Sequence, residues 1–322
     1  MPLIASSNYT APFLLNNGHL QTIIPALFRG TNGVNYRRER ICTPDDDFLD
    51  LDWSTQNKGT QKLVILTHGL EGNSSSKYLL GMVRALNKAG YDTLSWNMRS
   101  CSGESNKQVR FYHSGAIDDL DVVINHAAQK YGVIYLIGFS LGGNITLNYL
   151  GKAGAKIQQA NIQKGIAFSV PCHLESCAIN MEKFKNKVYL NRFLKSLKSK
   201  MLLKAELNPG TLLVDNIDQI NNFVDFDERY TGPIHGFEGA KDYYLKCSAL
   251  YVLKNIAIPT LLVNAQNDPF LSAECFPYKE AMSSSYFHFE APRSGGHCGF
   301  ITLGCTTNWA EKRAIEFLGA MV

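Results

Sequence analysis

One serine stands in a pattern that could make its hydroxyl a nucleophile. Ser140 is the central residue of a G-x-S-x-G motif over residues 138–142. An apolar run at 133–137 precedes the motif and an apolar, helix-like segment at 145–150 follows it. That order, strand then tight turn then helix, is typical of a nucleophile elbow, in which bulky neighbours of the serine would clash. The sequence therefore predicts an exposed nucleophile at a strand end, the alternative being a glycine-rich turn with an idle serine.

A serine hydroxyl needs a base to take its proton, and the base needs an acid to orient it. After such an elbow, the partners follow in the order acid, then histidine. Asp268 lies five residues past the apolar run at 260–263, and His297 lies in a glycine-flanked loop beyond the last expected strand. Sites on open sheets form at such strand ends. We predict that Ser140, Asp268 and His297 form a catalytic triad, with Glu175 as the alternative acid.

Negative charge on a substrate oxygen would require backbone N–H donors beside the serine. One is expected from Leu141, the residue after the nucleophile. The other is expected from Leu70, in an H-G segment that follows the apolar run at 63–66. Gly69 would let the chain turn so that the Leu70 amide faces the site. Taken alone, an H-G pair can also be a plain turn.

These residues require a frame of strands that end beside them. Continuous apolar runs, typical of strands buried on both faces of a parallel sheet, occur at 63–66, 93–96, 133–137, 166–170 and 260–263, with a weaker one at 286–289. Helix-like stretches, such as 78–89 and 117–130, separate most of them. The alternation predicts an α/β fold with a mostly parallel central sheet flanked by helices.

The beginning of the chain departs from this rhythm. Residues 1–33 are expected to be irregular, because they contain the breakers Asn-Asn-Gly at 16–18 and Pro25. Residues 34–42 could form the first strand. Apolar residues at 49, 51 and 53 then alternate with Asp50 and Asp52, which predicts a strand with one face in water.

A long interruption of the strand pattern predicts an insertion. We expect a helical lid at 171–245, and a core formed by 1–170 and 246–322. Residues 182–204 carry eight Lys or Arg and one acid, with apolar residues at helical spacing: Leu190, Phe193, Leu194, Leu197 and Met201. We interpret this stretch as a lid helix that packs its apolar stripe over the site. Weak contact with a membrane surface is the alternative.

Composition narrows the class of protein. The chain has 322 residues, 45% hydrophobic and 19% charged, and its net charge of +4 is too mild to indicate nucleic-acid binding. The N-terminus lacks the features of a secretory signal, and no apolar run is long enough to span a membrane. The eight scattered cysteines, without C-x-x-C, favour reduced thiols and a cytoplasmic location. We expect no metal, because the corresponding motifs are missing, and no cofactor, because serine-based catalysis requires none.

Taken together, the motifs resemble those of the YheT-like branch of the α/β-hydrolases, related to the abhydrolase-domain lipases and esterases. The shared segments cover essentially the whole chain and lie at 17–23, 67–72, 97–104, 112–115, 138–144, 235–237, 242–244, 267–270 and 296–300. The resemblance implies an α/β-hydrolase fold and a carboxylic ester hydrolase acting on small-molecule acyl esters, with acylglycerols and other lipid esters as candidate substrates. It also implies the same triad. Two residues depart from the family pattern: Ser100 replaces a usual glycine, and Asn267 a common second aspartate.

Other interpretations stay open at this point. An acyltransferase, a thioesterase or a peptidase could use the same triad, since they differ in acceptor or leaving group. A catalytically silent binding protein of this fold would usually have lost a triad member. Arg99 and His113 are interpreted as residues that hydrogen-bond within the structure, and Cys298 as a buried thiol without redox function.

Overall fold

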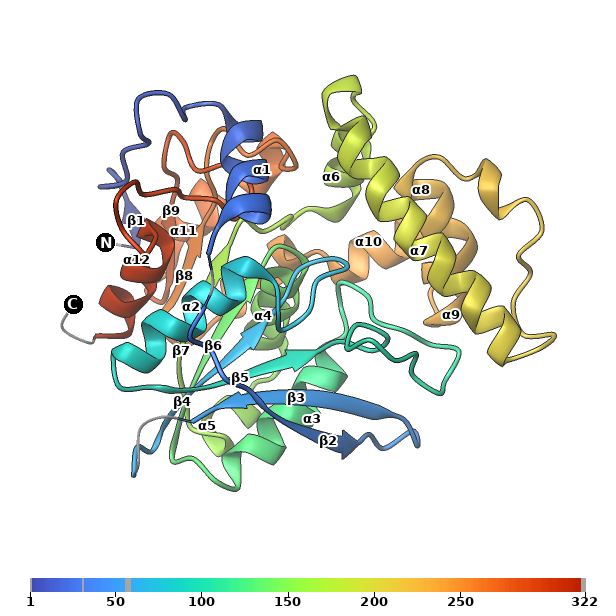
Figure 1. Ribbon diagram of the computed structural model, residues 1–322, viewed down its shortest axis with the longest axis horizontal. Coiled ribbons are helices and arrows are strands. Elements are labelled where there is room, and N and C mark those ends of the chain that lie inside the picture. The colour runs from blue at the N-terminus through green and yellow to red at the C-terminus, as the bar shows by residue number, and fades with distance from the viewer. Residues whose placement is uncertain (1, 31, 56–58, 320–322) are drawn as a thin grey trace.

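A computed structural model describes residues 2–30, 32–55 and 59–319. In these residues nine strands form one sheet in the order β1-β9-β8-β7-β6-β4-β5-β3-β2 (Figure 1). Only β3 runs against its neighbours β2 and β5, and every other pair of neighbours is parallel. The predicted fold class, a mostly parallel sheet flanked by helices, is confirmed.

Most strands fall on the expected apolar runs, but the strand expected at 166–170 spans residues 162–168. The strands are β1 (Leu3–Ile4), β2 (Arg37–Cys42), β3 (Phe48–Ser54), β4 (Lys62–Thr67), β5 (Asp92–Asn97), β6 (Val133–Phe139), β7 (Ile162–Phe168), β8 (Thr260–Val263) and β9 (Phe287–Glu290). The helices of the core are α1 (Gly18–Phe28), α2 (Lys77–Lys88), α3 (Ile117–Ala128), α4 (Leu141–Lys152), α5 (Lys156–Gln159), α11 (Tyr278–Ser283) and α12 (Trp309–Leu318). Between β7 and β8 lie α6 (Leu174–Met181), α7 (Lys187–Leu207), α8 (Phe223–Phe226), α9 (Gly232–Ile234) and α10 (Ala240–Cys247).

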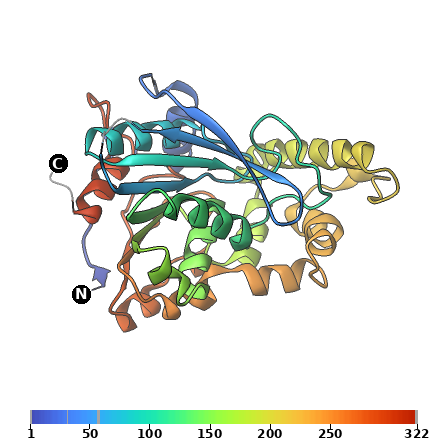
Figure 2. The ribbon, with the colours of Figure 1, turned by 90° about the horizontal axis from the view of Figure 1, so that it is seen from below.

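Helices cover both faces of the sheet, so the core has two layers (Figure 2). On one face α3 and α4 bury residues such as Leu120 and Ile145 against the strands. On the other face α2 and α12 bury residues such as Leu79 and Ala314. Strands between the layers are apolar on both sides, which explains why they appear in the sequence as continuous runs.

The expectation of an irregular start over residues 1–33 is wrong. Helix α1 forms there, and the supposed breaker Asn17 is its N-cap, whose side chain accepts a hydrogen bond from the His19 amide at 2.8 Å. Pro25 lies inside the helix. Asparagine is favoured at N-caps because its oxygen satisfies an amide that the first turn leaves unpaired, so the same residue can mark a turn or a helix start.

The expectation that one face of β3 lies in water is also wrong. Asp50 and Asp52 are each only 2% exposed. Directly opposite them on β2, Arg40 and Arg38 donate hydrogen bonds to their carboxylates at 2.7 and 2.8 Å. The alternation of apolar and acidic residues therefore marks a strand whose carboxylates are buried with cross-strand cations.

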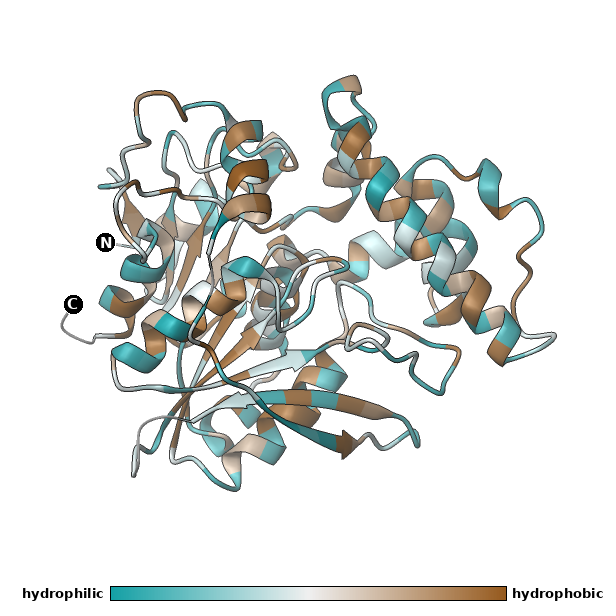
Figure 3. Ribbon diagram, in the orientation of Figure 1, coloured by the Kyte–Doolittle hydropathy of each residue, from teal (hydrophilic) through white to brown (hydrophobic). Residues whose placement is uncertain are grey.

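The segment between β7 and β8 is helical, and we call residues 171–245 the helical insert. Its longest helix, α7, spans 21 residues, and hydrophilic and hydrophobic residues both occur along its length (Figure 3). Four residues of the expected apolar stripe are buried: Leu190, Leu194, Leu197 and Met201. The stripe is therefore buried against protein, while the role of this helix as a lid and its contact with a membrane surface stay predictions. No described helix combines the length and the apolarity needed to cross a bilayer.

Candidate active site

Ser140 occupies the tight turn between β6 and α4. Its backbone has φ 53° and ψ −123°, a region that side-chain-bearing residues rarely adopt. A Cβ atom on Gly138 would lie 2.4 Å from the Gly142 carbonyl oxygen, and one on Gly142 would lie 2.2 Å from the His68 carbonyl oxygen. Both approaches are too close for any side chain. The predicted strand–turn–helix around the serine is therefore present, with glycine required on both sides.

The structure brings the three predicted triad residues together. Ser140 Oγ lies 2.8 Å from His297 Nε2, and His297 Nδ1 lies 2.9 Å from Asp268 Oδ2. The Asp268 side chain is fully buried, and its other oxygen accepts a hydrogen bond from the Phe270 amide at 2.9 Å. With the Nδ1 proton donated to the carboxylate, the Nε2 lone pair faces the serine hydroxyl. Glu175, the alternative acid, is exposed on α6.

Two residues that sequence reasoning missed hold the histidine. Thr22 of α1 accepts a hydrogen bond from the His297 amide at 2.9 Å. The Phe270 ring packs on the imidazole with 4.1 Å between ring centroids. Thr22 belongs to the shared segment at 17–23, so the signal was present, but it lay in a region expected to be irregular. Helix α1 is therefore part of the frame of the site.

Both departures from the family pattern have a structural account. Asn267 accepts a hydrogen bond from the Gly296 amide at 3.0 Å and donates one to the Asn16 carbonyl at 2.8 Å, so it ties the acid loop to the histidine loop and to the N-terminal segment. Ser100 has φ 60°, a left-handed conformation that favours glycine. Its hydroxyl hydrogen-bonds to the Asn106 side chain at 2.5 Å.

In the loop after β4, hydrogen bonds to the neighbouring peptide groups orient the Leu70 amide toward the site. His68 is fully buried, and burial lowers its pKa to about 4, so the ring is neutral. Its Nε2 accepts a hydrogen bond from the Met98 amide at 3.0 Å, so Nδ1 carries the proton and donates it to the Gly69 carbonyl at 2.8 Å. Because carbonyl and amide of one peptide point in opposite directions, this bond turns the Leu70 N–H away from His68.

The neighbouring amides of this loop are already used. Gly69 N–H donates to the Tyr78 hydroxyl, and Glu71 N–H donates to the Tyr112 hydroxyl, each at 2.9 Å. Within the described residues, the Leu70 amide has no hydrogen-bond partner. The same holds for the Leu141 amide, the first of α4. These are the two amides that the sequence predicted as donors.

A cavity of about 750 Å³ opens over Ser140 and His297. The core supplies one wall, including Leu70 and Leu141, and the helical insert supplies the opposite wall. Most of the residues from the insert are apolar or aromatic: Leu174, Ala178, Met181, Val188, Tyr189, Phe193, Leu197, Phe223 and Phe226. A pocket of this size and character suits a ligand with a hydrocarbon portion.

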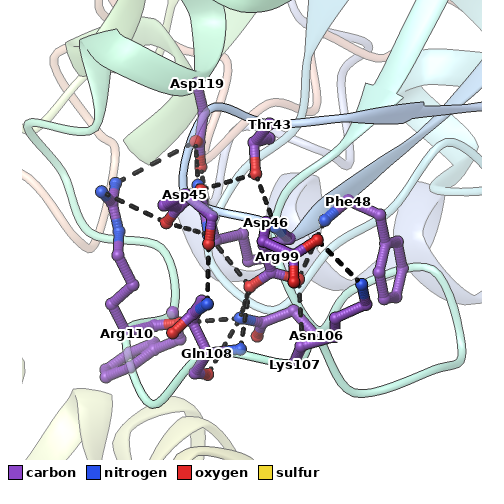
Figure 4. Close-up of polar contacts among 12 residues, drawn as sticks. Thr43, Asp45, Asp46, Phe48, Arg99, Asn106, Lys107, Gln108, Arg110 and Asp119 are labelled. Carbon is purple, nitrogen blue, oxygen red and sulfur yellow. Dashed lines mark hydrogen bonds and ion pairs between the residues drawn. The ribbon is translucent and has the colours of Figure 1, made fainter.

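Arg99 lies at the centre of a buried ionic cluster, the Arg99 cluster, at the end of β5 (Figure 4). All five of its N–H groups are used, by Asp45, Asp47 and Asp119, at 2.7–3.0 Å. Burial alone would raise the pKa of Asp45, but hydrogen bonds from Arg99 and Thr43 lower it to about 2. The interpretation of Arg99 as a structural hydrogen-bonding residue is confirmed.

His113 and Cys298 do not join the triad. Burial lowers the pKa of His113 well below its ordinary value, so it is neutral, and its Nδ1 accepts a hydrogen bond from the Gly115 amide at 3.1 Å. Cys298 is half-buried and not fully buried as interpreted, and desolvation raises the pKa of its thiol above the ordinary value, which favours the protonated form.

Comparisons with known proteins concern the family and the fold of the chain. A family model described as the alpha/beta hydrolase fold matches residues 62–301. The chain is 35% identical, over 94% of its length, to the candidate esterase YheT of Escherichia coli (strain K12), 90% of which is covered. It is 30% identical, over 94% of its length, to the phospholipase ABHD3 of Mus musculus, 76% of which is covered.

More distant matches have related names. The chain is 26% identical, over 89% of its length, to the monoacylglycerol lipase of Saccharomyces cerevisiae, 64% of which is covered. The solved structure of the Pyrococcus furiosus esterase PF2001 superposes with a TM-score of 0.59 at 20% identity, covering 88% of this chain and 91% of that one. The structural likeness concerns the fold.

Proposed function

Since the chain belongs to the YheT-like branch of the α/β-hydrolase family, we propose that it hydrolyses carboxylic esters through an acyl-enzyme formed on Ser140. The relatives it matches are named as esterase, phospholipase and monoacylglycerol lipase, and the protein is an enzyme of this ester-hydrolase type. The observation that carries the proposal is the continuous hydrogen-bonded chain from Ser140 through His297 to Asp268 at the floor of the cavity.

In the proposed first half-reaction, Ser140 Oγ attacks the ester carbonyl while His297 Nε2 takes the hydroxyl proton. The carbonyl oxygen becomes an anion, which the Leu70 and Leu141 amides bind. His297 then gives its proton to the leaving alcohol as the bond from carbonyl carbon to alkoxy oxygen breaks. Water then attacks the acyl carbonyl while His297 Nε2 takes one of its protons. The bond from carbonyl carbon to Ser140 Oγ breaks, His297 returns the proton to Oγ, and the acid is released.

Asp268 has two roles in this scheme. Its carboxylate accepts the Nδ1 proton in a hydrogen bond, which selects the tautomer with a free Nε2 lone pair. It also stabilises the imidazolium that forms once His297 holds the serine proton. The full burial of its side chain strengthens this effect, since charges interact more strongly away from water.

The substrates we propose are acyl esters with a hydrocarbon chain, among them acylglycerols and other lipid esters. The apolar residues of the helical insert would contact the acyl chain, while the ester bond lies against the polar floor formed by Ser140 and His297. We propose that residues 171–245 act as a lid, because they form a separate group of helices that supplies the wall opposite the triad (Figure 1).

Labelling with a fluorophosphonate probe tests this function, because the probe reacts covalently with activated serines. The parent should be labelled, and Ser140→Ala and His297→Ala should lose labelling while keeping their circular dichroism spectra. Ser199→Ala, which removes an exposed serine on α7, should label like the parent. Hydrolysis of p-nitrophenyl esters of rising chain length would then measure the capacity of the cavity. A folded parent that is neither labelled nor active would contradict the proposal and favour a binding protein.

A further inference from the structure

Glu71, directly after the proposed donor Leu70, is held in an unfavourable backbone conformation. Its φ is 54°, in the left-handed region that glycine and asparagine occupy most readily. A glutamate there is strained, so its surroundings must offset the strain. The reaction scheme above gives this side chain no role, although it belongs to the shared segment at 67–72 and lines the cavity.

The Glu71 carboxylate is fully engaged, and its partners come from the helical insert and the core. Lys200 of α7 donates to Oε1 at 2.7 Å, and Ser196, one turn earlier on α7, donates to Oε2. The Tyr112 hydroxyl donates to Oε1 at 2.6 Å while it accepts the Glu71 amide. Side-chain exposure is 8% for Glu71 and 17% for Lys200.

Such a buried ion pair fixes position more than it adds stability. Removing two charges from water costs about as much as their attraction returns, so an apolar pair of similar volume would stabilise the interface as well. The ion pair instead determines the position of α7, because both carboxylate oxygens have partners from α7 only where Lys200 and Ser196 both reach them. Helix α7 can therefore dock on the loop after β4 in one register.

We infer that Glu71 is a positioning residue that couples the docking of α7 to the orientation of the Leu70 amide. When the insert lies over the cavity, Lys200 and Ser196 hold Glu71. Glu71 then acts together with the bond from His68 to the Gly69 carbonyl to hold the loop in the conformation that leaves the Leu70 N–H free for the substrate oxygen. The oxyanion site is then complete only in the closed enzyme. This inference rests on the proposed function, since it assigns a consequence to the Leu70 amide.

The test compares Glu71→Gln, Lys200→Met and the double variant in the full chain, with kcat and KM measured on p-nitrophenyl butyrate. Losing one oxyanion donor costs about 10²–10³ in rate, so a misaligned donor should lower kcat by about 10- to 100-fold in either single variant. KM should stay within about twofold, since the amide binds the transition state and not the ground state. Because both residues act through one contact, the double variant should be no slower than the slower single variant.

Two further readouts separate positioning from a general structural role. Phenylboronic acid forms a tetrahedral adduct on an activated serine, so its inhibition constant should rise by the same factor as kcat falls. Lys195→Met, which removes an exposed lysine of the same helix, should leave both values unchanged. If Glu71→Gln fails to fold, Lys200→Met alone decides.

Three results would overturn the inference. In the first, both single variants fold and keep the kcat and the boronate affinity of the parent. In the second, the losses of kcat in the two single variants multiply in the double variant, because the two residues would then act independently. The third is a parent that is inactive and unlabelled by fluorophosphonate, which overturns the proposed function as well. An active parent with unaffected variants overturns the coupling alone.

Discussion

The triad and the Arg99 cluster are both buried polar networks beside strand ends, yet they differ in what they leave unpaired. In the Arg99 cluster every N–H of the guanidinium has a carboxylate partner. At the triad, the network ends on a serine hydroxyl in a cavity, beside two amides without partners among the described residues. One network is saturated and the other is open.

This difference shows how a polar network can be recognised as a candidate site. Charge and burial alone favour the Arg99 cluster, which has more ionised groups than the triad. What marks the triad is hydrogen-bonding capacity that the protein holds in place and leaves free, because preorganised donors act on the charge that develops in a transition state. A saturated network has no free donor or acceptor that could bind a substrate. Its hydrogen bonds hold the loops in place.

The largest effect on activity is expected from removing the acid of the open network. Asp268→Asn should lower kcat by about 10⁴, because an amide can donate to Nδ1 and so favours the wrong imidazole tautomer. Thermal unfolding should change little, since the shape of the side chain is kept. Glu175→Gln, at the alternative acid, should retain full kcat. The opposite pattern, with Glu175→Gln inactive, would reassign the acid.

Removing the cation of the saturated network should lower stability and leave kcat unchanged. Arg99→Met leaves Asp45, Asp47 and Asp119 without their shared partner and should cost about 3–5 kcal/mol of unfolding free energy. The kcat of the folded fraction should equal that of the parent. Urea denaturation and ester hydrolysis at low temperature measure both, with the exposed Arg37→Met as control. A large fall in kcat with unchanged stability would place Arg99 in the catalytic machinery.

Asp227, on the insert side of the cavity, is a further carboxylate, and it forms no ion pair with any residue that the structure describes. Burial raises the pKa of Asp227 to about 6, and its Oδ2 accepts a hydrogen bond from Tyr244 at 2.7 Å. The folded state therefore binds a proton more tightly than the unfolded state, whose aspartate has a pKa of 3.8. The contribution of this group to stability is full below about pH 4 and is lost as pH rises through about 6.

Asp227→Asn should therefore raise the unfolding free energy at pH 7–8 by up to about 3 kcal/mol, and the gain should vanish below about pH 4. Denaturation of parent and variant across this range measures it. The exposed Asp218→Asn, on the same insert, is the control and should show no such pH dependence. A gain of equal size at pH 4 and pH 8 would mean that the carboxylate is not desolvated.

Much of the frame could be predicted from the sequence because it depends on local patterns. The runs that became β4, β6 and β8 are continuous, and the elbow around Ser140 is encoded by five adjacent residues. Ser140, Asp268 and His297 each follow an expected strand. Their proximity could be predicted without any rule for the number of residues between them, because parallel strands bring their carboxyl ends to one edge of the sheet.

What could not be predicted depends on contacts between distant segments. Asp50 and Asp52 appeared to face water because the sequence does not show that the expected strand at 34–42, which carries their arginine partners, pairs with their own strand. Thr22 lies 275 positions from His297, and Glu71 lies 129 positions from Lys200. A polar residue in a single sequence carries no sign of such a partner, so its default interpretation is solvent exposure.

The backbone of Ser140 has a consequence for how this sequence is maintained. A residue held in so sparsely populated a conformation costs about 1–3 kcal/mol, and glycine at the same position would relieve much of that cost. Under selection for folding alone, serine should therefore drift to glycine at position 140, and the more stable chain would be inert. If a library of variants of this chain is selected separately for thermal stability and for ester hydrolysis, the two selected populations should differ first at position 140, because stability and activity favour different residues there.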